Sequence, residues 1–205
     1  RGTTVATNAR LERKGEKTLL AITKGFADIL RIGYQQRPEL FSLDIQLPDM
    51  LYSDVVEIDE RVDKGGKVLK PLDISDTKKI LSKAYKKGFK SIAIVLLHGY
   101  RYQEHERQIS IIANEIGFKQ ISVSHQISPL MKIIPRGDTT VVDAYLSPIL
   151  RRYVNQIRTK LGTSQSNLSQ LMFMQSNGGL TDANHFQGKD AILSGPAGGV
   201  VGMVK

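Results

Sequence analysis

The stretch LSGPAGGVVG, residues 193–202, combines spaced glycines, a proline and small apolar residues. We expect a short apolar strand at residues 191–193 to run into a turn there, and the residues after it to open a closely packed helix. Such a junction lets backbone amides approach a ligand, and a helix N-terminus favours an anion. On this stretch alone, a close-packed turn without a ligand is the simpler interpretation.

A second glycine turn, QSNGGL at residues 175–180, also follows an apolar run. Two such turns at the ends of neighbouring strands indicate one rim of a sheet. Ligands bind at that rim in α/β proteins. The two turns together therefore favour a binding site over two unrelated connections.

The composition is that of an ordinary globular protein. The chain has 205 residues, enough for one large or two small domains, of which 40% are hydrophobic and 24% charged. No apolar run is long enough to cross a bilayer, no signal pattern is present, and there is no cysteine, which agrees with a cytoplasmic protein. The net charge of +9 comes from basic residues mixed with acidic ones, so we expect solvated helix faces and no nucleic-acid or membrane partner.

The apolar run SIAIVLL, residues 91–97, predicts a strand covered on both faces. Further strands are expected at residues 18–23, 55–62, 120–124 and 171–174, and helices at residues 75–87, 102–116, 139–161 and 181–186. This alternation predicts an α/β fold with mixed sheets and covering helices. Residues 2–8 fit a strand end or a loop, residues 63–67 fit a hairpin turn, and Pro148 is expected to kink its helix or begin another.

Several polar residues have open interpretations. The spacing of His98 and His105 matches no zinc pattern, so we predict no metal site. Arg136 can bind an anion, or it can pair with Asp138 or Asp143 as a structural clamp. The sequence leaves both possibilities for Arg136 open.

Seven motifs in order resemble the hydantoinase A/5-oxoprolinase family, ATP-dependent amidohydrolases of the actin/sugar kinase/Hsp70 superfamily. They are GTTVATNA (2–9), LERKG (11–15), RPELF (37–41), LYSDVVEIDERV (51–62), PRGDTTVVDAYLSP (135–148), QSNGGL (175–180) and SGPAGGVVG (194–202). Residues 37–62 resemble the 5-oxoprolinase branch. The family has a histidine before the Gly-Thr-Thr run, where this chain has Arg1, so no role of that histidine carries over.

The resemblance implies a fragment of an actin/sugar kinase/Hsp70-like (ribonuclease H-like) ATPase fold. Residues 1–134 would be the N-terminal region and residues 135–205 the beginning of the nucleotide-binding core domain. The implied reaction opens 5-oxo-L-proline to L-glutamate while ATP is cleaved to ADP and phosphate, with Mg²⁺ as cofactor. The phosphate-binding hairpins would lie outside this segment, which alone would be inactive.

The resemblance also implies site residues. The predicted nucleotide-cleft residues are Ser176, Asn177, Gly178, Gly179, Gly195, Ala197, Gly198 and Gly199. The predicted substrate or phosphate contacts are Gly2, Thr3, Thr4, Asn8, Arg136, Asp143 and Tyr145, and no catalytic base is assigned.

The implied partners are a cyclic amide substrate and a second copy of the chain or a hydantoinase B-like region. Two alternatives remain for the function. One is an N-methylhydantoinase-type subunit that acts on another cyclic imide, and the other is a non-catalytic binding or assembly module.

Overall fold

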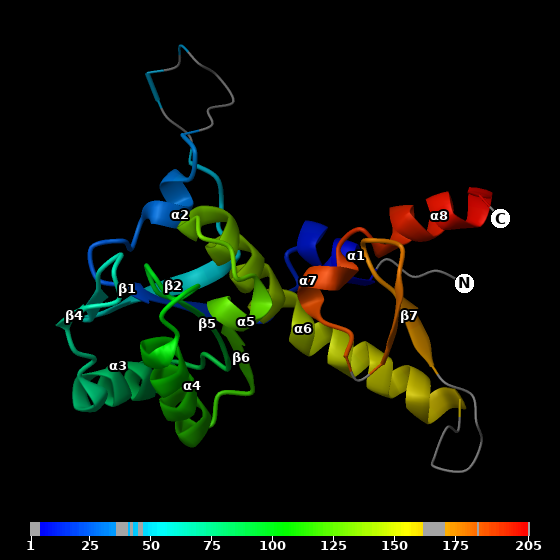
Figure 1. Cartoon of the computed structure of the whole chain (residues 1–205). Helices are drawn as coiled ribbons and strands as arrows, with labels where there is room; N and C mark the ends of the chain where they lie inside the picture. The colour runs from blue at the N-terminus through cyan, green and yellow to red at the C-terminus, as the bar shows by residue number, and fades with distance from the viewer. Residues whose placement is uncertain are drawn as a thin grey trace. The chain divides into compact units, whose positions relative to one another are not determined.

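The computed structural model describes residues 5–35, 41, 43–44, 47–161, 171–183 and 185–204. The chain forms two compact units (Figure 1). We call residues 17–141 the sheet unit, and residues 1–16 with 142–205 the glycine unit. The expected division of the sequence between residues 134 and 135 stays a prediction.

The sheet unit is built on four parallel strands in the order β2 (Tyr52–Ile58), β1 (Thr18–Thr23), β5 (Ser91–Val95) and β6 (Gln120–Val123). Every residue of β1 and β5 is buried, as the apolar run at residues 91–97 predicts. The chain places β2 on one side of β1 and then β5 on the other. The sheet therefore has a topological switch point between β1 and β5, where α/β proteins bind ligands beyond the carboxyl ends of the strands.

Helices cover this sheet. On one face α3 (Ile74–Lys86) and α4 (Glu104–Ile116) pack against alternate residues of β1 and β5 (Figure 1). The N-cap of α3 is Asp73, whose side chain accepts a hydrogen bond from Asp76 N, and α4 ends at Gly117 in the left-handed conformation. The buried core of this face consists mainly of Leu19, Ala21, Leu81, Phe89, Ile92, Ile94, Ile109, Ile112, Phe118 and Val123.

Short elements complete the sheet unit. They are α2 (Ile29–Ile32), α5 (Ser124–Ile127) and the hairpin of β3 (Arg61–Val62) and β4 (Val68–Lys70). The hairpin turn is held by Asp63 Oδ1, which accepts from the amides of Gly65 and Lys67 at 2.8 and 2.9 Å. This confirms the predicted hairpin turn at residues 63–67.

The glycine unit contains α1 (Val5–Leu11), the antiparallel pair β7 (Met172–Met174) and β8 (Leu180–Asp182), α7 (Gly188–Ala191) and α8 (Ser194–Val204). The 29-residue helix α6 (Ile133–Leu161) begins in the sheet unit, and its residues from Val142 onward belong to the glycine unit. The mixed α/β fold predicted from the sequence is confirmed. No helix among the described residues combines the length and apolar character needed to cross a bilayer.

Four local predictions are wrong. Residues 5–8 are helical, because Ala6 and Ala9 form a buried face of α1. Residues 180–182 form a strand and not a helix, because they pair with β7. No strand occupies residues 191–193, which lead from α7 directly into α8. Helix α6 begins at Ile133 and not at residue 139; it does not end at Pro148, so no second helix begins there.

Candidate functional site

The first glycine turn holds its own shape. Gln175 N donates to Gly179 O at 2.7 Å, and Gly179 N donates to the side chain of Asn177 at 2.9 Å. Gly178 has φ +83°, a conformation that favours glycine. The turn therefore connects β7 to β8 with a conformation set by these residues.

Ser176 joins this turn to the segment that leads into α8. Its amide and its hydroxyl both donate to Asp190 O, at 2.6 and 2.7 Å, and Leu193 N donates to the hydroxyl at 3.0 Å. A Cβ at Gly178 would lie 3.2 Å from a methyl group of Val201. The two glycine segments are therefore neighbours in one unit, but they do not form one rim of a sheet, because no strand leads into the second segment.

The second glycine segment is the beginning of α8. Gly195, Ala197, Gly198 and Gly199 all lie in its first two turns. The first four amides of an α-helix have no partner within the helix, and they carry a partial positive charge. Pro196 has no N–H, and Ala197 N donates to Leu193 O at 3.0 Å. Of the first four residues of α8, Ser194 and Gly195 therefore have the amides suited to an anion, although no strand precedes them as the sequence suggested.

A pocket lies beside the N-terminus of α8, with a volume of about 300 Å³. We call it the α8 pocket. Its walls come from α1, α6, β7 and the start of α8. The lining residues are Val5, Ala6, Leu150, Tyr153, Ile157, Leu171, Met172, Phe173, Met174, Phe186, Ala191, Ser194 and Gly195. Its wall is mostly apolar, with backbone amides on one side.

The predicted contacts in residues 2–8 are described only in part. Gly2, Thr3 and Thr4 lie outside the described residues, and Asn8 is exposed on α1. The sequence reasoning missed Thr7, whose hydroxyl donates to Ile192 O at 2.5 Å. That contact ties α1 to the residues that lead into α8.

Asp143 and Tyr145 are buried and make packing contacts. Asp143 Oδ1 accepts from the hydroxyl of Ser147 at 2.9 Å, and that hydroxyl accepts from Gly188 N at 2.9 Å, which fixes the start of α7. The ring of Tyr145 packs on Gly15, where a Cβ would lie only 1.9 Å from the ring carbons. Contact of Asp143 or Tyr145 with substrate stays a prediction.

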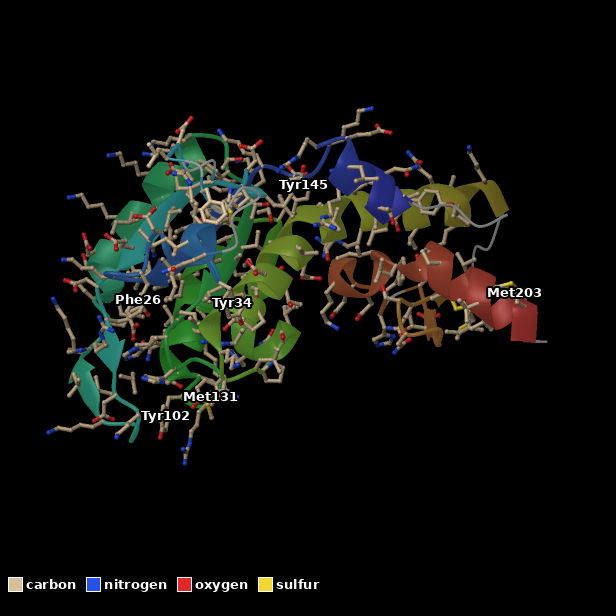
Figure 2. The ribbon with its side chains drawn as sticks, turned by 90° about the horizontal axis from the view of Figure 1, so that it is seen from above. Phe26, Tyr34, Tyr102, Met131, Tyr145 and Met203 are labelled. Carbon is tan, nitrogen blue, oxygen red and sulfur yellow. The ribbon has the colours of Figure 1, made fainter. Side chains whose placement is uncertain are left out.

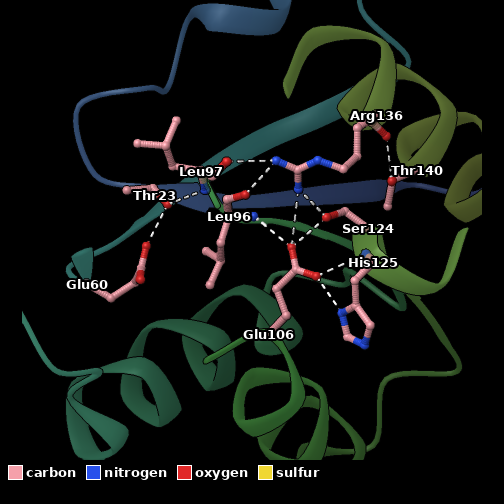
Figure 3. Close-up of polar contacts among 9 residues, drawn as sticks. All are labelled: Thr23, Glu60, Leu96, Leu97, Glu106, Ser124, His125, Arg136 and Thr140. Atoms are coloured by element: carbon pink, nitrogen blue, oxygen red, sulfur yellow. Dashed lines mark hydrogen bonds and ion pairs between the residues drawn. The ribbon is translucent and has the colours of Figure 1, made fainter. Parts of the chain in front are cut away.

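Arg136 is fully buried in the sheet unit (Figure 3). Its guanidinium donates to Leu96 O and Leu97 O at 2.8 and 2.9 Å and also to the hydroxyl of Ser124. Its ion-pair partner is Glu106, at 3.6 Å, and not Asp138 or Asp143. Burial lowers the pKa of Arg136, and the carboxylate of Glu106 opposes that shift. The arginine acts here as a structural clamp on residues 96–97.

Glu106 on α4 completes this clamp (Figure 3). One carboxylate oxygen accepts from Leu96 N at 2.9 Å and from the hydroxyl of Ser124 at 2.6 Å. The other lies 3.1 Å from His125 N and 2.7 Å from His125 Nδ1. Since a carboxylate only accepts, Nδ1 carries the hydrogen of this contact. We call Glu106, Ser124, His125 and Arg136 the Glu106 network.

A second buried carboxylate, that of Glu60, is linked to Leu97 through Thr23. Glu60 accepts from the hydroxyl of Thr23 at 2.6 Å and lies 2.7 Å from His105 Nδ1. The hydroxyl of Thr23 in turn accepts from Leu97 N at 3.0 Å. Among the described residues, no group of three or more histidines, aspartates or glutamates is placed to hold a metal ion.

Comparisons with family models and with known proteins point to one family. Residues 1–117 match the family model of the hydantoinase/oxoprolinase N-terminal region, and residues 136–205 match the hydantoinase/oxoprolinase model. The chain is 46% identical to a 5-oxoprolinase of Dictyostelium discoideum, over 100% of this chain and 18% of the relative. It is 43% identical to 5-oxoprolinase 1 of Arabidopsis thaliana, over 98% of this chain and 17% of the relative. The chain thus spans less than a fifth of the length of these relatives.

Two solved structures have the same fold as this chain. The ATP-dependent caprolactamase from Pseudomonas jessenii superposes with a TM-score of 0.80 at 30% identity, over 96% of this chain and 29% of that one. Nucleotide-free acetone carboxylase superposes with a TM-score of 0.82 at 23% identity, over 97% of this chain and 30% of that one, which shows the fold alone. Since the N-terminal family model alone covers more than half of the residues, the chain belongs to the hydantoinase/oxoprolinase family.

Proposed function

We propose that the full-length protein is an ATP-dependent 5-oxoprolinase, which opens 5-oxo-L-proline to L-glutamate and cleaves ATP to ADP and phosphate. The observation that carries this proposal is the identity of 43–46% with 5-oxoprolinases along the entire chain. The likeness to a caprolactamase, at 30% identity, supports the same class of reaction, because caprolactam is also a cyclic amide.

The chemistry explains why ATP is needed. The amide of a five-membered lactam is stabilised by resonance, so water alone attacks its carbonyl carbon slowly. Transfer of the γ-phosphoryl group of ATP to the amide oxygen makes that carbon electrophilic. Water then adds to the carbon, and the C–N bond breaks with the nitrogen leaving as the amine. The acyl phosphate that results is hydrolysed by a second water to the carboxylate and inorganic phosphate. Mg²⁺ neutralises phosphate charge in such reactions.

The described residues supply part of this machinery. Ser194 and Gly195, at the start of α8, line the α8 pocket, and their amides are suited to a phosphate or to the oxyanion of the opening amide. In this proposal Gly195, Gly198 and Gly199 allow close backbone approach, and the turn at Ser176–Gly179 borders the same site. The phosphate-binding hairpins are proposed to lie outside residues 1–205, with residues 135–205 beginning the nucleotide-binding core domain.

We also propose a cellular setting for this reaction. We place the protein in the cytoplasm and in glutathione metabolism, where 5-oxoproline would be returned to glutamate. We also propose that it assembles with a second copy or with a hydantoinase B-like region.

The test is ATP turnover by the full-length protein with Mg²⁺, with and without 5-oxoproline. Release of phosphate and of glutamate is measured in the same reaction. Coupled release of both supports the proposal. Phosphate release stimulated only by a hydantoin assigns the protein to the hydantoinase branch instead. Neither release, from folded protein, leaves a binding or assembly module.

A further inference from the structure

An open pocket of about 630 Å³ lies in the sheet unit, at the carboxyl end of β5. We call it the Arg101 pocket. Its residues come from the segment after β5, the β3–β4 hairpin and the start of α6, and Figure 2 shows Met131 and Tyr102 at this edge. The lining residues are Lys64, Gly65, Leu97, His98, Tyr100, Arg101, Met131 and Ile133. This edge also carries the topological switch point between β1 and β5, where α/β sheets place ligands.

The charged residues of this pocket are both positive. Lys64 and Arg101 are exposed lining residues, and no aspartate or glutamate lines the pocket. Neither side chain forms an ion pair within the described part of the chain. The adjacent acid, Asp63, is engaged by the two backbone amides of its turn. Both cations therefore remain available to an anion.

Neutral residues also line the pocket, and they include both hydrogen-bond donors and apolar side chains. His98 and Tyr100 carry ring groups able to donate hydrogen bonds, with ring centroids 6.4 Å apart. Leu97, Met131 and Ile133 provide apolar wall. This combination suits a small molecule with a negative head and a hydrocarbon body better than it suits a bare inorganic anion.

The pocket is built on a fixed piece of backbone. The amides of Leu96 and Leu97 donate to Glu106 and Thr23, and both of their carbonyls accept from Arg136. The next turn passes directly over the buried carboxylate, because a Cβ at Gly99 would lie 2.3 Å from Glu106 Oε1. A binding group supported by such buried contacts is pre-organised. His98, Tyr100 and Arg101 follow immediately from this anchored point.

The positive residues are also held in place. The hydroxyl of Tyr102 donates to Lys64 O at 3.2 Å, which joins the hairpin to the segment after β5. The guanidinium of Arg101 lies 5.5 Å from the ring centroid of Tyr102, within range of a cation–π contact. One tyrosine therefore contacts both the backbone of Lys64 and the guanidinium of Arg101.

We propose that the Arg101 pocket binds the carboxylate of a small organic acid, with Arg101 and Lys64 facing the carboxylate and the apolar wall facing the carbon skeleton. The identity of the acid rests on the proposed function, which makes it 5-oxoproline. The site is assigned to recognition of the substrate carboxylate.

The experiment uses the full-length protein and three probes: 5-oxoproline, 2-pyrrolidinone (the same ring without the carboxylate) and inorganic phosphate. Binding is measured by calorimetry for the wild type, for the double variant Lys64→Gln/Arg101→Gln, and for Arg107→Gln. The last is a matched control, since Arg107 is exposed on α4, bonds to Gln103 and does not line the pocket. KM and kcat for 5-oxoproline are measured in parallel.

The double variant is expected to bind 5-oxoproline at least tenfold more weakly and to raise KM by a similar factor, because two charged contacts are lost. Arg107→Gln should match the wild type. Wild-type affinity for 2-pyrrolidinone should be weak and unchanged by the double variant. Unchanged binding and KM in the double variant would overturn the proposal. So would an equal loss for 2-pyrrolidinone, or binding of phosphate in preference to 5-oxoproline.

The two proposals fail in different ways. If the wild type releases glutamate and phosphate but the double variant keeps its KM, the pocket assignment is wrong and the reaction stands. If the wild type binds 5-oxoproline through Lys64 and Arg101 but releases no glutamate, the pocket stands and the reaction is wrong.

Discussion

Replacing Glu106 by glutamine removes the negative charge that faces Arg136 in the sheet unit. Both side chains are fully buried, and the carboxylate oxygens meet two backbone amides, a hydroxyl and a histidine nitrogen. In Glu106→Gln, the amide oxygen still accepts, but the new NH₂ group faces donors. Arg136 also loses its counter-charge.

The expected cost follows from the burial of the pair. Breaking a buried ion pair by changing one partner costs about 3–5 kcal/mol. Because glutamine keeps the shape and one acceptor, we expect about 3 kcal/mol, on the order of a 100-fold change in the unfolding equilibrium of the sheet unit. The network also fixes Leu96 and Leu97, so the Arg101 pocket should loosen in the same variant.

Hydrogen exchange of the full-length protein, read by mass spectrometry on peptides from β5 and α4, measures this change directly. Amides that exchange only when the unit opens should do so on the order of 100-fold faster in Glu106→Gln. The matched control is Glu104→Gln, since Glu104 lies on the same helix but is exposed and bonds only to Gln108 among the contacts described. Its effect should stay within about twofold. Equal exchange in the two variants would refute the argument that the Glu106 network stabilises the unit.

Three further changes test the glycine unit. Gly15→Ala should destabilise it by about 1–3 kcal/mol, since the new Cβ would overlap the buried ring of Tyr145, and local hydrogen exchange should rise accordingly. Gly188→Ala should expose α7 to exchange for a similar reason, because its Cβ would lie 2.8 Å from Ser147 N. In Gly199→Ala the new Cβ meets no described atom within 4 Å, so the change should stabilise α8 by up to about 1 kcal/mol. The same change should lower ATP turnover of the full-length protein, and unchanged turnover would contradict a role of Gly199 at the cleft. The 205-residue chain alone should release no phosphate from Mg²⁺ and ATP, and steady release would contradict the placement of the phosphate-binding hairpins elsewhere.

Local patterns were sufficient for several elements of the sheet unit, but the strand expected at residues 55–62 is divided into β2, which ends at Ile58, and β3 at Arg61–Val62. The strand at residues 18–23 has the predicted bounds, and α4 ends before Gly117 as its glycine indicates. These features depend on residues next to one another in sequence. Helix α3 shows the limit of this reasoning, since a start at residue 75 was expected, but the helix begins at Ile74 and Asp73 makes the capping bond.

The Glu106 network could not be found in the same way. Glu106 lies on an amphipathic helix, where a charged residue is normally solvated, and its partner Arg136 is thirty positions away. Only the assembled sheet brings the two side chains together with Ser124. In the glycine unit, likewise, the strand at residues 180–182 exists because it pairs with β7, and its own sequence did not indicate a strand.

The composition of α8 connects the fold to the proposed chemistry. Four of its eleven residues are glycine, at positions 195, 198, 199 and 202. Each costs about 1 kcal/mol of helix stability relative to alanine. Packing within the described residues does not demand the last three, since a Cβ at Gly198 would lie 3.8 Å from Met174 and those at Gly199 and Gly202 would meet nothing within 4 Å. These three glycines lower the intrinsic stability of the helix by about 3 kcal/mol without a steric reason. Residues that weaken their own secondary structure in this way are expected at functional sites. We propose that these glycines allow a phosphate-bearing ligand to approach the backbone of α8, whose first glycine, Gly195, lines the α8 pocket.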